Sequence, residues 1–131
     1  MGEYEDTLKD IEKSFGFVPG FMKAIPKDVL TKDWPLMKKY QMGESVIPQK
    51  YREFIGLAVA ANIKCPYCTL MHTAMATGYG ASGDEISEVA FLASLTARWS
   101  AMLHALQYNY DTFVKEVHQV GEYGKKQAAK K

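Results

Sequence analysis

Cysteine is sparse in this chain, with only two residues among 131. A secreted scaffold held by several disulfides needs more, so the pair is a redox couple, half of a metal site, or two inert core thiols. A strong charge of one sign is also missing, because 16 basic and 15 acidic side chains nearly cancel. Before Lys125 no basic cluster offers a surface for nucleic acid, so we expect no nucleic-acid partner.

Long apolar runs are absent as well. The longest weakly polar stretch, residues 54–63, is far shorter than the roughly 20 apolar residues that span a bilayer. The first residues lack the basic segment and apolar run of a secretory signal. We therefore expect a soluble, cytoplasmic protein without a membrane partner.

Strand signals are scarce, whereas apolar residues recur at helical spacing through most of the sequence. The predicted fold class is all-α, a single-domain helical bundle over residues 1–131. Within it we expect an N-terminal helical extension over about 1–45, a redox core over about 46–120, and a basic tail over 121–131.

The N-terminal extension contains clear helix-stop signals. A first helix should end at Gly16, and residues 17–21 form an apolar turn before a short helical piece. Pro26 then opens a third segment. Pro35 should break or kink that segment near Asp33, because proline removes a backbone donor and crowds the preceding turn.

Two consecutive helices are predicted in the middle of the chain. Pro48 suits the start of a helix that runs to residues 63–64 and carries Glu53. Pro66 starts the next helix with Cys65 at its N-cap, and the glycines at 78 and 80 allow it to end there. The connection is short enough for the two helices to pack against each other.

The C-terminal part is predicted to be helical too. Ser82 and Glu85 have the spacing of a capping box, which indicates a further helix start. From Leu95, apolar positions predict one long helix or two nearly continuous ones, which Gly121 and Gly124 bring to an end. The lysine-rich tail beyond them should be solvated and frayed.

Chemistry is concentrated in the motif Cys65-Pro66-Tyr67-Cys68 and its surroundings. Cys68 follows Cys65 by three residues, and His72 follows Cys68 by four, so the three side chains point to roughly one helical face. A helix N-terminus carries about half a positive charge, which should lower the pKa of both thiols. His72 is the candidate base for Cys68, and Glu53 is the carboxylate expected to orient the imidazole.

Several chemical uses of this cluster are open. The cysteine spacing permits a small disulfide ring, which favours redox cycling over a structural staple. Cys65, Cys68, His72 and Glu53 could instead form a closed zinc site in a structural or scaffold protein, since these ligand types suit zinc. A redox sensor is a third option, without a partner motif to support it. No flavin or nicotinamide motif is present, so electrons must come from elsewhere and we expect no bound cofactor.

The spacing Glu-x11-Cys-x2-Cys-x3-His, formed by Glu53, Cys65, Cys68 and His72, resembles the core signature of a known family. That family is the alkylhydroperoxidase D-like branch of the carboxymuconolactone decarboxylase superfamily. The turn at residues 78–81 fits the same pattern. The resemblance covers roughly residues 15–106 and is more specific than the cysteine pair alone.

This resemblance implies an all-helical fold that assembles into homotrimers or homohexamers and reduces hydroperoxides or disulfides through its thiols. Cys68 would be the thiolate that attacks peroxide, Cys65 the resolving thiol, His72 the proton acceptor and Glu53 the relay carboxylate. A dithiol such as a lipoyl or thioredoxin-like protein would be the reductant. Tyr67 occupies a position where some members carry an additional histidine, so a proton path through that position is absent.

Two alternatives accompany the resemblance. In thioredoxin-like motifs the N-terminal cysteine is the more exposed nucleophile, which would favour Cys65. We prefer Cys68 as the attacking residue because His72 is its neighbour. Decarboxylase members of the superfamily lack the cysteine pair, so lactone decarboxylation is the less favoured activity.

Overall fold

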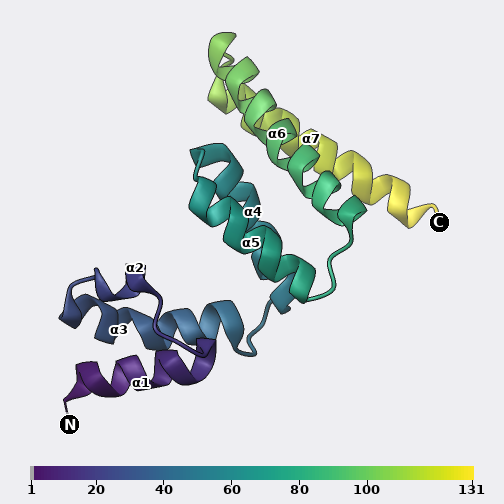
Figure 1. The fold of residues 1–131 in the computed structure, drawn as a ribbon. Coiled ribbons are helices and arrows are strands. Elements are labelled where there is room, and N and C mark those ends of the chain that lie inside the picture. Colours follow the sequence, from purple (N-terminus) through teal and green to yellow (C-terminus); the bar gives the residue numbers. More distant parts are fainter. Residues whose placement is uncertain (1) are drawn as a thin grey trace. The chain divides into compact units, whose positions relative to one another are not determined.

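A computed structural model describes residues 2–131 of the chain, and every regular element in that range is helical. The elements are α1 (Glu3–Phe15), α2 (Gly20–Lys23), α3 (Lys27–Met37), a π-helix η1 (Lys38–Met42), α4 (Gln49–Ile63), α5 (Pro66–Gly78), α6 (Gly83–Ala105) and α7 (Tyr110–Ala129) (Figure 1). The all-α prediction is confirmed.

Residues up to 90 and residues 91–131 form two compact units, and the boundary falls inside α6. The single domain and the predicted boundaries of its extension, redox core and tail stay a prediction.

The N-terminal helices enclose a small core. It is formed by Ile11, Met22, Leu30 and Trp34, each at most 2% exposed. Burying such side chains stabilises the fold by roughly 1.5–3 kcal/mol each. The Trp34 indole donates a hydrogen bond to Asp10 Oδ2 at 2.7 Å, which joins α3 to α1 and satisfies the buried N–H. α1 ends as predicted at Gly16, whose φ of 84° suits glycine.

The predicted break near Asp33 is wrong. α3 continues through Pro35 to Met37, and the irregularity comes later, in the π-helix η1. Leu30 and Trp34 are buried on the face that packs against α1, and the bond to Asp10 fixes the turn just before the proline. Tertiary packing therefore outweighs the local cost of the missing proline N–H.

Helices α4 and α5 pack side by side and position the functional motif (Figure 1). Pro48 is the N-cap of α4, one residue outside the helix start that the sequence predicted. At the other end Lys64 adopts a left-handed conformation with φ 59°, and Cys65 N–H donates to Ala60 O at 3.0 Å. This tight turn reverses the chain within two residues, so the start of α5 lies beside the end of α4.

Charged side chains brace the first turn of α4. The Arg52 guanidinium donates to the carbonyls of Tyr40, at 2.6 Å, and Gly43, at 2.5 Å, and thereby ties α4 to the end of η1. Ser82 and Glu85 form the predicted capping box, with both reciprocal bonds present at 3.1 and 3.0 Å. Glu85 also pairs with Lys50 at 3.0 Å, which links the first turn of α6 to the first turn of α4.

Of the two predicted arrangements of the C-terminal part, two helices rather than one long helix are present, and the predicted C-terminal end differs. The apolar periodicity that starts at Leu95 is divided between α6 and α7 by a turn at residues 106–109, in which Gln107 has φ 50°. α7 then runs through Gly121 and Gly124 to Ala129, so the expected helix end and frayed tail are wrong. Each glycine costs a helix roughly 1 kcal/mol, and the strong helix formers in residues 125–128 offset that cost.

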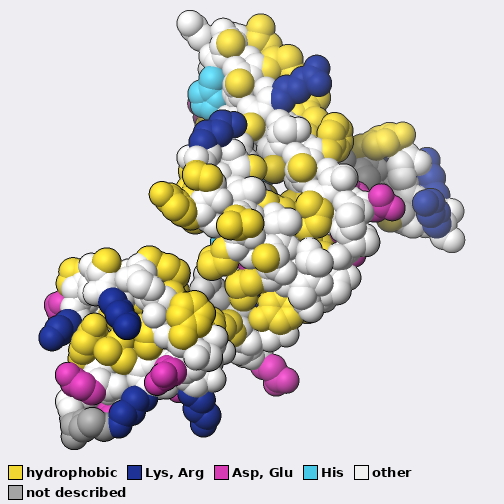
Figure 2. All heavy atoms as spheres, viewed as in Figure 1, with side chains coloured by type: hydrophobic (Ala, Val, Ile, Leu, Met, Phe, Trp, Pro, Cys, Tyr) yellow, Lys and Arg dark blue, Asp and Glu magenta, His cyan; other side chains and the backbone are white. Residues whose placement is uncertain are grey.

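Residues 91–131 bury very little of their apolar surface. Ala93 is the only buried apolar residue in this range, whereas large apolar side chains are exposed, among them Phe91, Trp99, Phe113, Val117 and Val120. Figure 2 shows how apolar side chains gather in surface patches on the visible face. Within residues 2–131 no helix combines the length and the apolar character that a membrane span requires.

Candidate active site

The two cysteines lie at the start of α5, as the sequence predicted. Cys65 is the N-cap residue with an extended backbone, Pro66 is the first helical residue, and Cys68 occupies the third helical position. Both cysteines are free and partly exposed. Their Sγ atoms are 2.7 Å apart, and the backbone N–H of Cys68 donates to Cys65 Sγ at 3.2 Å. The thiols can therefore share a proton and can form a disulfide with little movement.

These contacts distinguish the two thiols electrostatically. The hydrogen bond from the Cys68 thiol, assisted by the Cys68 backbone amide, lowers the pKa of Cys65 below its usual value. The same interaction raises the pKa of Cys68, because its proton is held by Cys65 and desolvation adds to the effect. The predicted lowering is thus confirmed for Cys65 and wrong for Cys68. When the pair loses one proton, the negative charge therefore lies mainly on Cys65.

Glu53 and His72 form a second pair, between α4 and α5. His72 Nδ1 lies 2.6 Å from Glu53 Oε2, and the Glu53 side chain is 2% exposed. A carboxylate only accepts hydrogen bonds, so in the tautomer that satisfies this contact Nδ1–H donates, and Nε2 is the ring nitrogen that can accept a proton. Burial fixes the carboxylate, and the carboxylate fixes the ring. The sequence-based expectation that Glu53 orients His72 agrees with this geometry.

The two pairs remain separate. Within residues 2–131 no direct hydrogen bond joins Cys68 to His72, although helical spacing puts them on one face of α5. A proton passing between them requires a bridging water or a small side-chain movement. In the same range no three His, Cys, Asp or Glu side chains are arranged as a common set of metal ligands. The four residues of the zinc alternative thus form two polar pairs.

Sequence inspection missed Gly56. This residue lies in the middle of α4, and an added Cβ there would come within 2.5 Å of the His72 ring. A glycine inside an otherwise regular helix was the available signal, since such a residue often marks a close packing contact.

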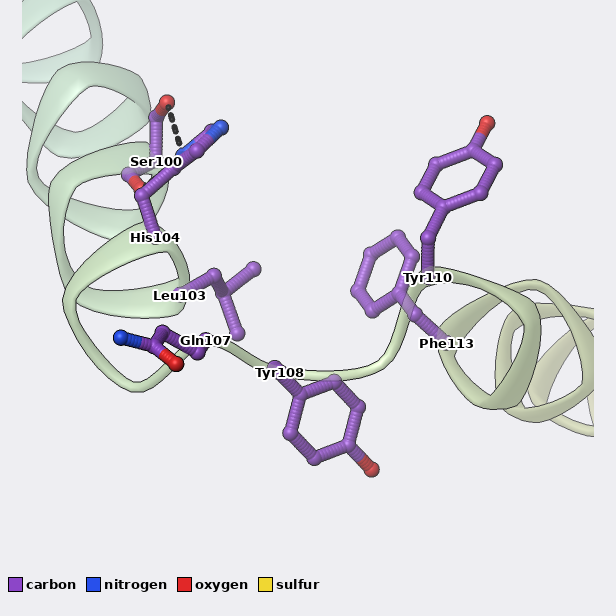
Figure 3. A pocket seen from close by; sticks show the side chains of 7 residues that line it. All are labelled: Ser100, Leu103, His104, Gln107, Tyr108, Tyr110 and Phe113. Atoms are coloured by element: carbon purple, nitrogen blue, oxygen red, sulfur yellow. Dashed lines mark hydrogen bonds between the residues drawn. The ribbon is translucent and has the colours of Figure 1, made fainter.

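Two shallow hollows lie elsewhere on the surface. One, of about 440 Å³, is lined by Ser100, Leu103, His104, Gln107, Tyr108, Tyr110 and Phe113 at the turn between α6 and α7 (Figure 3). His104 Nδ1 lies 2.7 Å from the Ser100 carbonyl, so this nitrogen is engaged by its own helix. The other hollow, of about 510 Å³, lies beside Arg52 and Ile55. Neither is lined by the cysteines, Glu53 or His72.

The chain resembles known proteins in its sequence and in its fold. The sequence model of the Carboxymuconolactone decarboxylase family matches residues 30–109. A solved structure, the alkylhydroperoxidase AhpD core from Rhodospirillum rubrum, is 29% identical, covers 86% of both chains, and superposes with a TM-score of 0.73. No curated protein matches the sequence.

Proposed function

This chain belongs to the carboxymuconolactone decarboxylase family and has the fold of its alkylhydroperoxidase D-like branch, and on this premise we propose that it is a thiol-dependent oxidoreductase. Its substrates are hydroperoxides or disulfides. The observation that carries the proposal is the pair of free sulfurs 2.7 Å apart at the N-terminus of α5. Two thiols in this arrangement supply the two electrons that a peroxide bond requires.

The peroxide reaction proceeds in two steps. The Cys68 thiolate attacks the terminal peroxide oxygen, the O–O bond breaks, and the alcohol leaves with one proton while Cys68 becomes a sulfenic acid. Cys65 then attacks the Cys68 sulfur, which forms the disulfide and releases the hydroxyl group as water. In total two thiols and one hydroperoxide give one disulfide, one alcohol and one water.

The raised pKa of Cys68 indicates what Glu53 and His72 do in the reaction. A thiol that holds its proton needs a base before it can attack, whereas the lowered pKa of Cys65 already favours its thiolate. We assign His72 Nε2 as that base, reached through a water, with Glu53 holding the ring and stabilising the imidazolium. His72 then returns the proton to the leaving alkoxide. If Cys65 attacked first, the reaction would not require His72 to remove a proton from Cys68.

Regeneration requires an external dithiol, which attacks the Cys65 to Cys68 disulfide and leaves as a disulfide itself. A lipoyl or thioredoxin-like protein is the reductant we propose, and the cytoplasm, where such dithiols are kept reduced, is the compartment. A homotrimer or homohexamer is the proposed assembly. The apolar side chains exposed along residues 91–131 support self-association.

Turnover measurements separate the two substrate classes. The purified protein is assayed with cumene hydroperoxide and with a model aromatic disulfide, with dihydrolipoamide as the electron donor in both cases. We expect catalytic turnover of at least one substrate, lost in both Cys65→Ser and Cys68→Ser. Dihydrolipoamide consumption at the uncatalysed rate with both substrates would refute the proposal.

A further inference from the structure

The imidazole of His72 lies on the bare backbone of α4. A Cβ atom at residue 56 would be 2.5 Å from Cε1 and 2.6 Å from each ring nitrogen. Nearly equal distances to three adjacent ring atoms put that position over the face of the ring, since an approach at the edge would leave the nitrogens farther away than Cε1. The ring therefore packs flat against Gly56.

The His72 ring is held in this contact by its hydrogen bond to Glu53. Its Nδ1 is bonded to Glu53 Oε2 at 2.6 Å, and Glu53 is only 1% exposed. Glu53 and Gly56 are three residues apart, so one face of α4 presents the carboxylate and the bare backbone one turn apart. Any side chain at 56 would lift the ring and lengthen its bond to Glu53.

The backbone itself does not require glycine here. Positive φ values occur at Gly16 and Gly80 among the described glycines, and Gly56 has an ordinary helical conformation. Glycine is less favourable than alanine inside a helix. Helix propensity alone would thus favour alanine at this position. The contact with the His72 ring explains why glycine is present instead.

We propose that Gly56 is a positioning residue, which allows His72 to lie against α4 and bond to Glu53. This inference rests on the proposed relay. Gly56 has no side chain to react with substrate or with the cysteines, and it acts only through the ring that it accommodates.

A double-mutant cycle in turnover tests the proposal. Gly56→Ala should lower kcat/KM by about as much as His72→Ala does, roughly 10²- to 10⁴-fold, and should move the pH-rate profile in the same way. In the His72→Ala background it should cause no further loss. Gly121→Ala is the matched control, since Gly121 is also inside a helix and a Cβ there meets nothing within 4 Å. An equal loss from Gly56→Ala in both backgrounds would overturn the inference.

Thermal unfolding gives a second reading that does not depend on activity. When His72 is alanine the clash is gone, so Gly56→Ala should raise the Tm by roughly 2–8 °C through helix propensity. In the native background the same substitution should lower the Tm or prevent folding. A rise of equal size in both backgrounds, or failure of the double variant to fold, would contradict the proposal.

The two readings separate this inference from the proposed function. If the native protein reduces neither substrate, the proposed function fails, and the thermal cycle still decides whether the ring needs Gly56. If the native protein is active and Gly56→Ala retains its full rate and pH profile, the inference about Gly56 fails and the proposed function stands.

Discussion

The backbone N–H of Cys68 donates to Sγ of Cys65 across 3.2 Å, so the first cysteine of the motif is stabilised as a thiolate by the second. Because this contact and the Cys68 thiol lower the pKa of Cys65, alkylation of Cys65 should set in at a lower pH than alkylation of Cys68. Iodoacetamide labelling of the reduced protein across pH, followed by peptide mass spectrometry, measures the pKa of each thiol.

Two substitutions refine this prediction. Cys68→Ser keeps a hydroxyl donor and should leave the pKa of Cys65 lowered. Cys68→Ala removes the side-chain donor and should raise the pKa of Cys65 toward its usual value, with the backbone bond left in place. Labelling of Cys68 before Cys65 in the native protein would contradict the charge distribution described above.

The relay predicts a loss of rate without a loss of fold. His72→Ala or Glu53→Gln should lower peroxide turnover by roughly 10²- to 10⁴-fold at neutral pH, the usual contribution of a general base. Activity should recover as the pH rises, because the solvent then removes the proton from Cys68. Stopped-flow rates between pH 6 and 10, with circular dichroism as the folding control, provide the test. Wild-type rates in both variants at neutral pH would assign these residues a structural role.

Trapping the first oxidation product shows which cysteine attacks the peroxide. In Cys65→Ser the resolving thiol is missing, so one equivalent of hydroperoxide should leave a sulfenic acid on Cys68. Trapping with dimedone and sequencing the labelled peptide identifies the residue. In the reciprocal variant, Cys68→Ser, we expect no rapid trapping at Cys65. Faster labelling in that reciprocal variant would reverse the two roles.

Self-association is expected from the exposed apolar side chains of residues 91–131. Sedimentation equilibrium at micromolar concentration should give a trimer or hexamer. Trp99 is 53% exposed, and Trp99→Glu should weaken the assembly by placing a charge in an apolar contact. Gln119→Glu, with the same charge change at an exposed polar position, is the control. A stable native monomer would exclude the assembly.

Local sequence signals predicted the elements that carry chemistry. Pro66 at a helix start, Cys65 at the N-cap and the Ser82 to Glu85 capping box all form as expected, because each depends on neighbours within four residues. The approach of Glu53 to His72 also followed from sequence, since a two-residue turn between adjacent helices leaves few other arrangements.

Features that depend on distant contacts were not predictable in the same way. α3 stays helical through Pro35 because Trp34 is anchored to Asp10, which lies 24 residues earlier. The opposite pKa shifts of the two thiols arise from one shared proton, which residue spacing does not reveal. Gly56 matters only because an imidazole from another helix lies on it.

A single-turnover reaction tests the thiol mechanism most directly. The fully reduced protein is mixed anaerobically with one equivalent of cumene hydroperoxide, and free thiols, cumyl alcohol and protein mass are followed together. We predict the loss of two thiols per peroxide, one equivalent of alcohol, and a mass decrease of two hydrogens from an intramolecular disulfide between Cys65 and Cys68. Unchanged peroxide with both thiols still free, or a stable product that has gained oxygen without a disulfide, would contradict it.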